Sequence, residues 1–218
     1  MITVPVTYVI LGISIVLSLI CFNNKELKYK LLFSPYSAKH HKRWYNVITH
    51  AFIHGDYIHL FFNMFVLWSF GYQTSQGEAY GLEADFVNYF GQFGQLYYLM
   101  LYVGGILFAT IPAFYKHSNN PNYMSLGASG AVSALLFSYI ILHPFSSLNL
   151  MILPGVDIPA IIFGALYLAF EIYASKRAKD NIAHDAHYSG AIFGILLTIA
   201  LRPSTVTEFI DQCQALFQ

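Results

Sequence analysis

The chain has 218 residues, of which 56% are hydrophobic and 10% charged, and its mean hydropathy is +0.52. This composition excludes an ordinary soluble domain and a disordered chain, and it predicts an all-α integral membrane protein. A net charge of zero argues against nucleic acid as a partner. Cys21 and Cys213 are too far apart to suggest a disulfide framework, so we interpret both as packing residues.

Six apolar runs predict six membrane-spanning helices in one domain that covers residues 1–218. The predicted spans are residues 2–22, 58–72, 96–115, 127–143, 158–174 and 188–201. The first run contains no charged side chain and matches the roughly 20 residues that a bilayer crossing needs. The second, fourth and sixth runs are short, so we expect them to begin below the membrane surface, where protein or water surrounds their polar ends.

The first loop, residues 23–57, is the longest between the runs. It carries six lysines and arginines together with Trp44 and Tyr45, which predicts an amphipathic insertion at the membrane interface. Ten of the eleven lysines and arginines follow the first, third and fifth runs, whereas only Arg202 lies on the opposite side. The positive-inside rule therefore places these three loops in the cytoplasm.

His59 and Asn63 are polar residues in the second run. Because they are four residues apart, a helix would place them on one face, where both can point at a common target. The plainer alternative is that Asn63 only joins two helices, since such interhelical hydrogen bonds are common and average about 0.6 kcal/mol. Both interpretations remain open for these two residues.

Ser129 opens the fourth run between Gly127 and Gly130. Glycine here permits a tight turn into the helix and a close approach of another backbone, although alanine would stabilise the helix by about 1 kcal/mol more. In the first helical turn, free backbone N–H groups and the helix dipole favour an alkoxide or an oxyanion. The serine therefore suits a nucleophile, and an equally open alternative is a helix N-cap.

His187 directly precedes the sixth run and, on a helix, lies on the same face as Gly190 and Gly194. This small-residue stripe predicts close packing against another membrane helix. If that helix is the fourth, whose Gly130 and Ala134 are also four residues apart, the histidine meets the serine of that run. The alternative is an interfacial histidine that marks the start of the helix.

Three motifs together resemble the signature elements of the rhomboid intramembrane serine proteases. They occur in the family's order and on matching spans: His54-x-x-x-x-His59-x-x-x-Asn63 ahead of Gly71, Gly127-Ala128-Ser129-Gly130, and Ala186-His187-x-x-Gly190-x-x-x-Gly194. The resemblance covers the whole chain and implies a six-transmembrane-helix rhomboid bundle with a long interfacial first loop.

The resemblance also implies roles for individual residues and no metal or cofactor. Ser129 would be the nucleophile and His187 the general base, in a dyad without a carboxylate. His59 and Asn63, with the backbone N–H of Ser129, would form the oxyanion hole. His54 and His50 would brace the first loop against the second span. Asp185 is two residues from His187 and so faces elsewhere on the helix.

The partners implied by the resemblance are transmembrane protein substrates and the lipid bilayer. Substrate access would lie between the second and fifth spans, and Pro154, Gly155 and Pro159 before the fifth span interrupt a helix as a mobile segment would. Bacterial relatives imply a multi-pass protein of a bacterial inner membrane that opens away from the cytoplasm, opposite to the charge count. Many members carry an aromatic residue where this chain has Ser133.

Two other functions remain open. The chain could be a catalytically inactive rhomboid-like protein that binds transmembrane helices without cutting them. It could also be a membrane metalloenzyme with histidine ligands, because His50-x-x-x-His54 and His184-x-x-His187 place imidazoles near one another. The metal hypothesis lacks a His-Glu-x-x-His motif and a carboxylate at ligand spacing.

Overall fold

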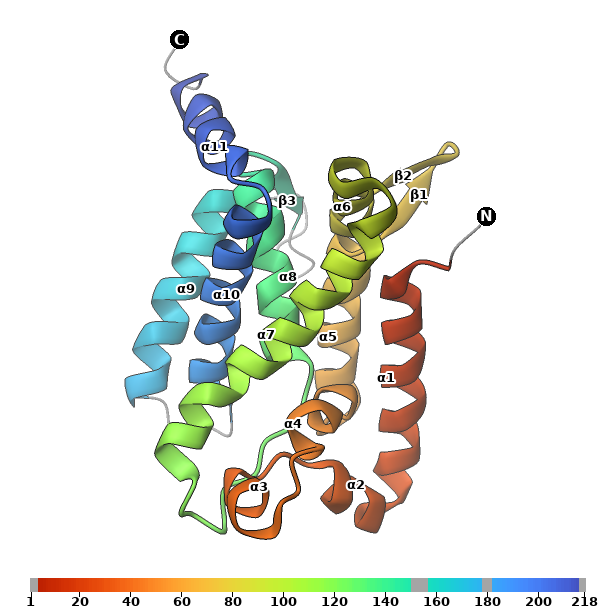
Figure 1. The fold of residues 1–218 in the computed structure, drawn as a ribbon, viewed down its shortest axis with the longest axis vertical. Helices are drawn as coiled ribbons and strands as arrows, with labels where there is room; N and C mark the ends of the chain where they lie inside the picture. The colour runs from red at the N-terminus through yellow and green to blue at the C-terminus, as the bar shows by residue number, and fades with distance from the viewer. Residues whose placement is uncertain (1–3, 150–156, 178–181, 216–218) are drawn as a thin grey trace.

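The structure is a computed structural model that describes residues 4–149, 157–177 and 182–215. Within these residues the chain is mostly helical, and long helices lie side by side along the long axis of the molecule (Figure 1). Two small antiparallel hairpins accompany them, which the all-α prediction did not include. One pairs β1 (Gln73–Ser75) with β2 (Glu78–Tyr80), and the other pairs β3 (Ser147–Asn149) with β4 (Asp157–Pro159).

Each of the six predicted spans corresponds to one long helix. These helices are α1 (Val6–Asn23), α5 (Tyr57–Phe70), α7 (Gly94–His117), α8 (Ser129–Leu142), α9 (Ala160–Arg177) and α10 (His184–Leu201). The last begins four residues earlier than predicted, so His187 lies within its first turn. Pro154 and Gly155 fall outside the described residues.

The number of helices that could cross a membrane by themselves is smaller than six. In the described part of the chain, α1 and the continuous helical run 82–117 are long and apolar enough, and α10 with α11 (Ser204–Ala215) qualifies only as a pair bent by 107°. Helices α5 and α8 have 14 residues each, about 21 Å, whereas a hydrocarbon core is about 30 Å thick. The count of six spans is therefore not confirmed by helix length.

The segment predicted as a long loop, residues 23–57, is largely helical. It contains α2 (Lys25–Leu31), α3 (Pro35–His41), α4 (Asn46–Thr49) and the 3-10 helix η1 (His50–Phe52). Asn24 and Ser34 cap α2 and α3 by accepting backbone N–H bonds, and α3 has proline at its first turn. These helices have seven residues or fewer, so none of them produces the long apolar run by which the spans were predicted.

The acidic linker between α5 and α7 folds into the hairpin β1–β2, helix α6 (Leu82–Phe90) and the 3-10 helix η2 (Gly91–Phe93). Its Glu83 is fully buried. The carboxylate accepts hydrogen bonds from the backbone N–H groups of Val6 and Thr7 at 2.7 and 2.8 Å. It thus caps α1 from a distance, because Pro5 at the N-cap of α1 offers no side-chain oxygen.

Helix α8 is the most buried helix and packs directly against α10. A Cβ on Gly190 would lie 2.0 Å from the carbonyl oxygen of Gly130, and one on Gly194 would lie 2.1 Å from that of Ala134. The two backbones therefore touch through the predicted small residues, as membrane helices with this spacing do. This contact brings the first turn of α10 against the first turn of α8.

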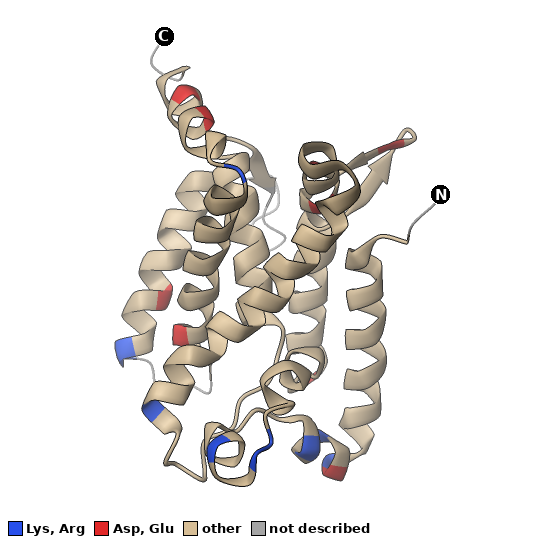
Figure 2. Ribbon diagram, viewed as in Figure 1, with Lys and Arg blue, Asp and Glu red and all other residues tan. Residues whose placement is uncertain are grey.

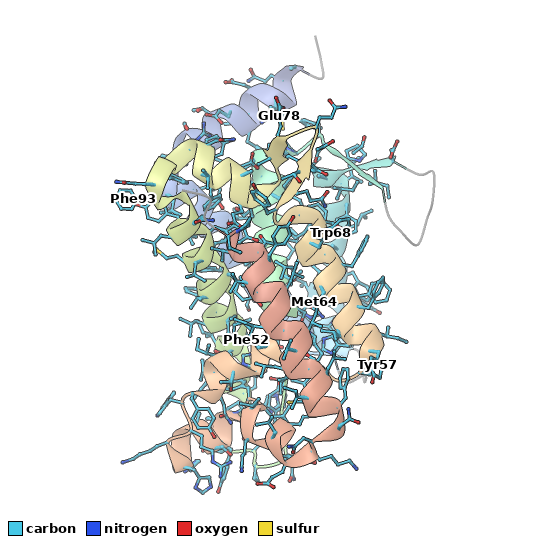
Figure 3. All side chains as sticks on the ribbon, turned by 90° about the vertical axis from the view of Figure 1, so that its right-hand side faces the viewer. Phe52, Tyr57, Met64, Trp68, Glu78 and Phe93 are labelled. Atoms are coloured by element: carbon cyan, nitrogen blue, oxygen red, sulfur yellow. The ribbon has the colours of Figure 1, made fainter. Side chains whose placement is uncertain are left out.

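Charged residues mark the two ends of the bundle. Lysines and arginines gather at the end formed by α2, α3 and the last turns of α7 and α9 (Figure 2). The helical surface between the ends is apolar, and Figure 3 shows α1 beside α5 with Tyr57, Met64 and Trp68 along α5. Tyr57 and Trp68 are 66% and 47% exposed, as expected for side chains that face lipid.

Candidate active site

Ser129 is the first residue of α8, at the end nearer the 23–57 insertion. Gly127 allows the turn that precedes it, because its φ of +113° is a conformation that side chains with a Cβ rarely adopt. A Cβ there would also lie 2.6 Å from the ring of His59. The first backbone N–H groups of an α-helix have no acceptor within the helix, so those at the start of α8 can donate to a ligand.

His187 lies in the first turn of α10 and meets Ser129. Its Nε2 is 2.7 Å from the Ser129 Oγ, a normal hydrogen-bond distance. The imidazole is 13% exposed, so the pair is mostly shielded from solvent. At this distance an imidazole can accept the proton of a hydroxyl, which is the geometry that a nucleophile and a general base require.

Glu171 of α9 stands behind the imidazole, where no carboxylate was expected. Its Oε1 lies 3.1 Å from Nδ1 of His187, although the N–H direction falls short of a formed hydrogen bond. Its Oε2 lies 2.6 Å from Nδ1 of His184. Glu171 is the charged residue inside the predicted fifth span, and that position was the available signal, because ionisable residues within membrane helices are usually functional.

Asp185 and Ser133 have other partners. The Asp185 carboxylate pairs with Lys116 at 3.0 Å, in agreement with the expectation that it faces away from the imidazole. The hydroxyl of Ser133, one turn after Ser129, lies 3.1 Å from the hydroxyl of Tyr167 on α9. Tyr167 is one turn before Glu171, so α9 supplies both groups to this side of α8.

The two predicted oxyanion residues lie on α5 near the site, but neither forms a hydrogen bond with Ser129 in the described residues. His59 packs against Gly127, and its Nδ1 accepts the backbone N–H of Gly55 at 3.3 Å. The Asn63 amide donates to the carbonyl of His59 at 2.9 Å. That amide nitrogen carries a second hydrogen for another acceptor.

His54 and His50 hold the approach to α8 in place. The Nε2 of His54 accepts the backbone N–H of Ala128 at 3.4 Å, and its Nδ1 lies 2.9 Å from the hydroxyl of Ser18 on α1. The carbonyl of His50 accepts the N–H of Gly127 at 2.9 Å. Burial lowers the pKa of His54 to about 3 and that of His50 to about 4, so both rings are neutral at pH 7.

Two further features bear on the chemistry. A cavity of about 30 Å³ touches Ser129 and has polar lining groups from Thr110 and Ser125, which is room enough for a water molecule. Glu171, His184 and His187 present ligand atoms within 4.8 Å of one another, a spacing at which three side chains can hold a metal ion. The His184–Glu171 separation of 2.6 Å is that of a strong hydrogen bond.

Comparison with known proteins identifies the kind of domain. The model of the Rhomboid domain matches residues 41–204. Similar proteins are RHOMBOID-like protein 12, mitochondrial, of Arabidopsis thaliana (29% identity, 73% of this chain, 47% of the relative) and Rhomboid-like protein 11, chloroplastic, of the same plant (31%, 71% and 51%). A third is Presenilin-associated rhomboid-like protein A, mitochondrial, of Danio rerio (27%, 68% and 35%).

The chain thus spans about half or less of the length of these relatives. Their names also correct one expectation from the sequence. A bacterial inner membrane is wrong by this comparison, because the similar proteins are mitochondrial or chloroplastic. Apolar spans and loop charges indicate that a chain lies in a membrane, but they do not identify the organelle or cell to which that membrane belongs.

Proposed function

Because the chain belongs to the rhomboid family, we propose that it is an intramembrane serine endopeptidase that cuts transmembrane helices of other proteins. The observation that carries this proposal is the 2.7 Å contact between Ser129 Oγ and His187 Nε2 at the start of two packed apolar helices. An inactive helix-binding protein would have no need of this pair. The relatives' names lead us to propose an organellar membrane as its location.

The proposed reaction begins with attack by the Ser129 oxygen on the carbonyl carbon of the scissile peptide bond. His187 Nε2 accepts the hydroxyl proton, and a tetrahedral oxyanion forms. When the C–N bond breaks, His187 returns this proton to the leaving amine. Water then attacks the acyl-enzyme and gives a proton to His187. His187 returns this proton to the Ser129 oxygen as the acyl–oxygen bond breaks, which restores the hydroxyl and releases the new carboxyl terminus. The small polar cavity beside Ser129 suits this water.

The oxyanion hole in this proposal consists of the Ser129 backbone N–H, His59 and Asn63. Helix α8 directs its first N–H groups toward the reacting carbonyl. Asn63 would use its second amide hydrogen, or release the His59 carbonyl and turn. In soluble serine proteases, loss of one such donor raises the barrier by about 2.7–4 kcal/mol.

The whole chain, residues 1–218, would form one membrane domain with six spans, in which α5 and α8 cross only part of the bilayer. A substrate helix must unwind locally, because an intact helix keeps its carbonyls in internal hydrogen bonds. We place its access between α5 and α9. A cavity of about 430 Å³ separates Phe65 and Phe70 of α5 from Phe163 of α9, toward the end of α8 far from Ser129.

The decisive experiment combines cleavage and labelling of the purified protein in detergent. Wild-type protein is expected to cut a model transmembrane substrate and to react with a fluorophosphonate at Ser129. Ser129→Ala and His187→Ala are each expected to lower cleavage by about 10³-fold or more. Ser138→Ala is the matched control, because this buried serine of α8 bonds to Thr198 instead, at 2.6 Å.

Cleavage that persists in Ser129→Ala would contradict the proposal. Treatment with a chelator distinguishes the protease from the metalloenzyme alternative. The cluster of Glu171, His184 and His187 is the observation that favours that alternative. Activity that disappears on treatment with a chelator and survives in Ser129→Ala would establish metal chemistry. Folded wild-type protein that binds transmembrane helices without cutting them would establish the inactive binder.

A further inference from the structure

Glu171 is a buried carboxylate whose surroundings require an explanation. Its side chain is 5% exposed, and it lies on an apolar helix proposed to cross the membrane. Burying an unpaired carboxylate in such a place has a high free-energy cost. Ionisable residues inside membrane helices are therefore usually paired and usually belong to functional sites. Its two oxygens reach two different imidazoles, of His184 and His187, both on α10.

The contacts assign different tasks to the two oxygens. Oε2 lies 2.6 Å from Nδ1 of His184, which holds the carboxylate in one orientation. Oε1 is thereby directed to Nδ1 of His187 at 3.1 Å. That nitrogen is buried and has no hydrogen-bond partner among the described residues. A small rotation of either side chain would complete the bond, and catalytic hydrogen bonds are often loose before substrate binds.

The tautomer of His187 makes this contact important for proton transfer. If Nε2 is to accept the proton of Ser129, the single hydrogen of the neutral ring must be on Nδ1. Glu171 is the acceptor that lies next to this hydrogen. When the ring takes the serine proton and becomes positively charged, the carboxylate stabilises that charge in a site of low dielectric constant.

We propose that Glu171 positions His187 and completes a Ser129–His187–Glu171 triad, with His184 holding the carboxylate in place. The inference rests on the proposed proteolytic function and departs from the dyad expected from the sequence. Glu171 acts through His187 and does not touch the substrate. Nucleophile and base pairs oriented by a third group occur on unrelated folds, so the arrangement is chemically sufficient.

Glu171→Gln tests the proposal, because it keeps the shape of the side chain and removes its charge. We expect kcat to fall about 10- to 100-fold, less than the roughly 10⁴-fold known for a fully formed carboxylate–histidine bond, with KM changed less than about threefold. The rate of fluorophosphonate labelling per folded molecule should fall in parallel. Glu171→Asp, which restores the charge at a shorter reach, should recover part of kcat and of the labelling rate.

Glu83→Gln is the matched control, since it neutralises another buried carboxylate that caps α1 instead. It should lower thermal stability and leave kcat of the folded fraction unchanged. If Glu171→Gln also lowers only stability, or keeps kcat within twofold of wild type while Ser129→Ala is inactive, the triad is overturned and the protease stands. Loss of the wild-type rate with a chelator would overturn it in favour of a metal. A wild-type protein without cleavage or labelling would overturn the proposed function itself.

Discussion

Two buried carboxylates lie toward opposite ends of this molecule and have different surroundings. Glu83, near the first turn of α1, accepts backbone N–H bonds from Val6 and Thr7 and a hydroxyl bond from Thr7 at 2.8 Å. Glu171 faces two imidazoles, one of which contacts the hydroxyl of Ser129. Burial is nearly complete for both, so burial does not distinguish them.

The partners of the two carboxylates indicate their roles. Backbone N–H groups do not change protonation, and a carboxylate that binds them secures a helix end. Imidazoles exchange protons near neutral pH, and a carboxylate beside them influences which nitrogen holds the proton. A buried acid is therefore best interpreted from the groups that it touches.

The largest expected effect on stability is at Glu83. Glu83→Ala would leave the backbone N–H groups of Val6 and Thr7 without an acceptor, whereas the Thr7 hydroxyl and the Gln95 amide each keep a second partner. At about 1–3 kcal/mol for each backbone donor, a loss of about 2–6 kcal/mol is expected. Thermal unfolding in detergent measures the loss, and kcat per folded molecule should be unchanged. A fall in kcat without a fall in stability would contradict a purely structural role for this carboxylate.

Acidification should weaken the end of the molecule that holds Ser129. The pKa values of His50 and His54 are lowered to about 4 and about 3, below the ordinary value of 6.5. The unfolded state therefore binds more protons as the pH falls below about 6.5, and stability falls with it. At about pH 5.5 the loss is about 1.4 kcal/mol for each imidazole. His54→Gln should reduce this pH dependence, and an unchanged dependence would contradict the assignment.

The smallest effect is expected at Asp185, the carboxylate nearest to His187 in sequence. Its partner is Lys116, whose side chain is 46% exposed, and ion pairs at the surface contribute about 0–1 kcal/mol. Asp185→Asn should thus change the unfolding temperature little and keep kcat within twofold. A loss of kcat as large as that of Glu171→Gln would show that proximity along the chain matters more than the observed contacts.

The sequence was informative where spacing determines contact. Gly190 and Gly194 are four residues apart, as are Gly130 and Ala134, and a helix with such a stripe packs against a partner with the same spacing. This pattern predicts that α8 and α10 pack against each other, and in the structure their backbones are in contact at these residues. The family follows from motifs of the same kind, and the matched domain confirms it.

Contacts between distant segments could not be predicted in the same way. Glu83 lies between the second and third predicted spans, and nothing in its neighbourhood in the sequence reveals that the uncapped start of α1 lies beside it. The helix α11 was not predicted because its sequence is polar. Arg202 pairs with Glu208 where α11 turns away from α10. Glu171 was visible as a charge in an apolar run, but its partner depended on how α9 packs against α10.

The shortness of α8 has a consequence for the products of the proposed reaction. A helix of about 21 Å that reaches one side of a 30 Å hydrocarbon layer begins about 9 Å below the other side. A bond cut at that depth leaves about six apolar residues on one fragment and about fourteen on the other. The shorter stub is too small to remain anchored, so a single cut would release one half of a membrane protein and retain the other.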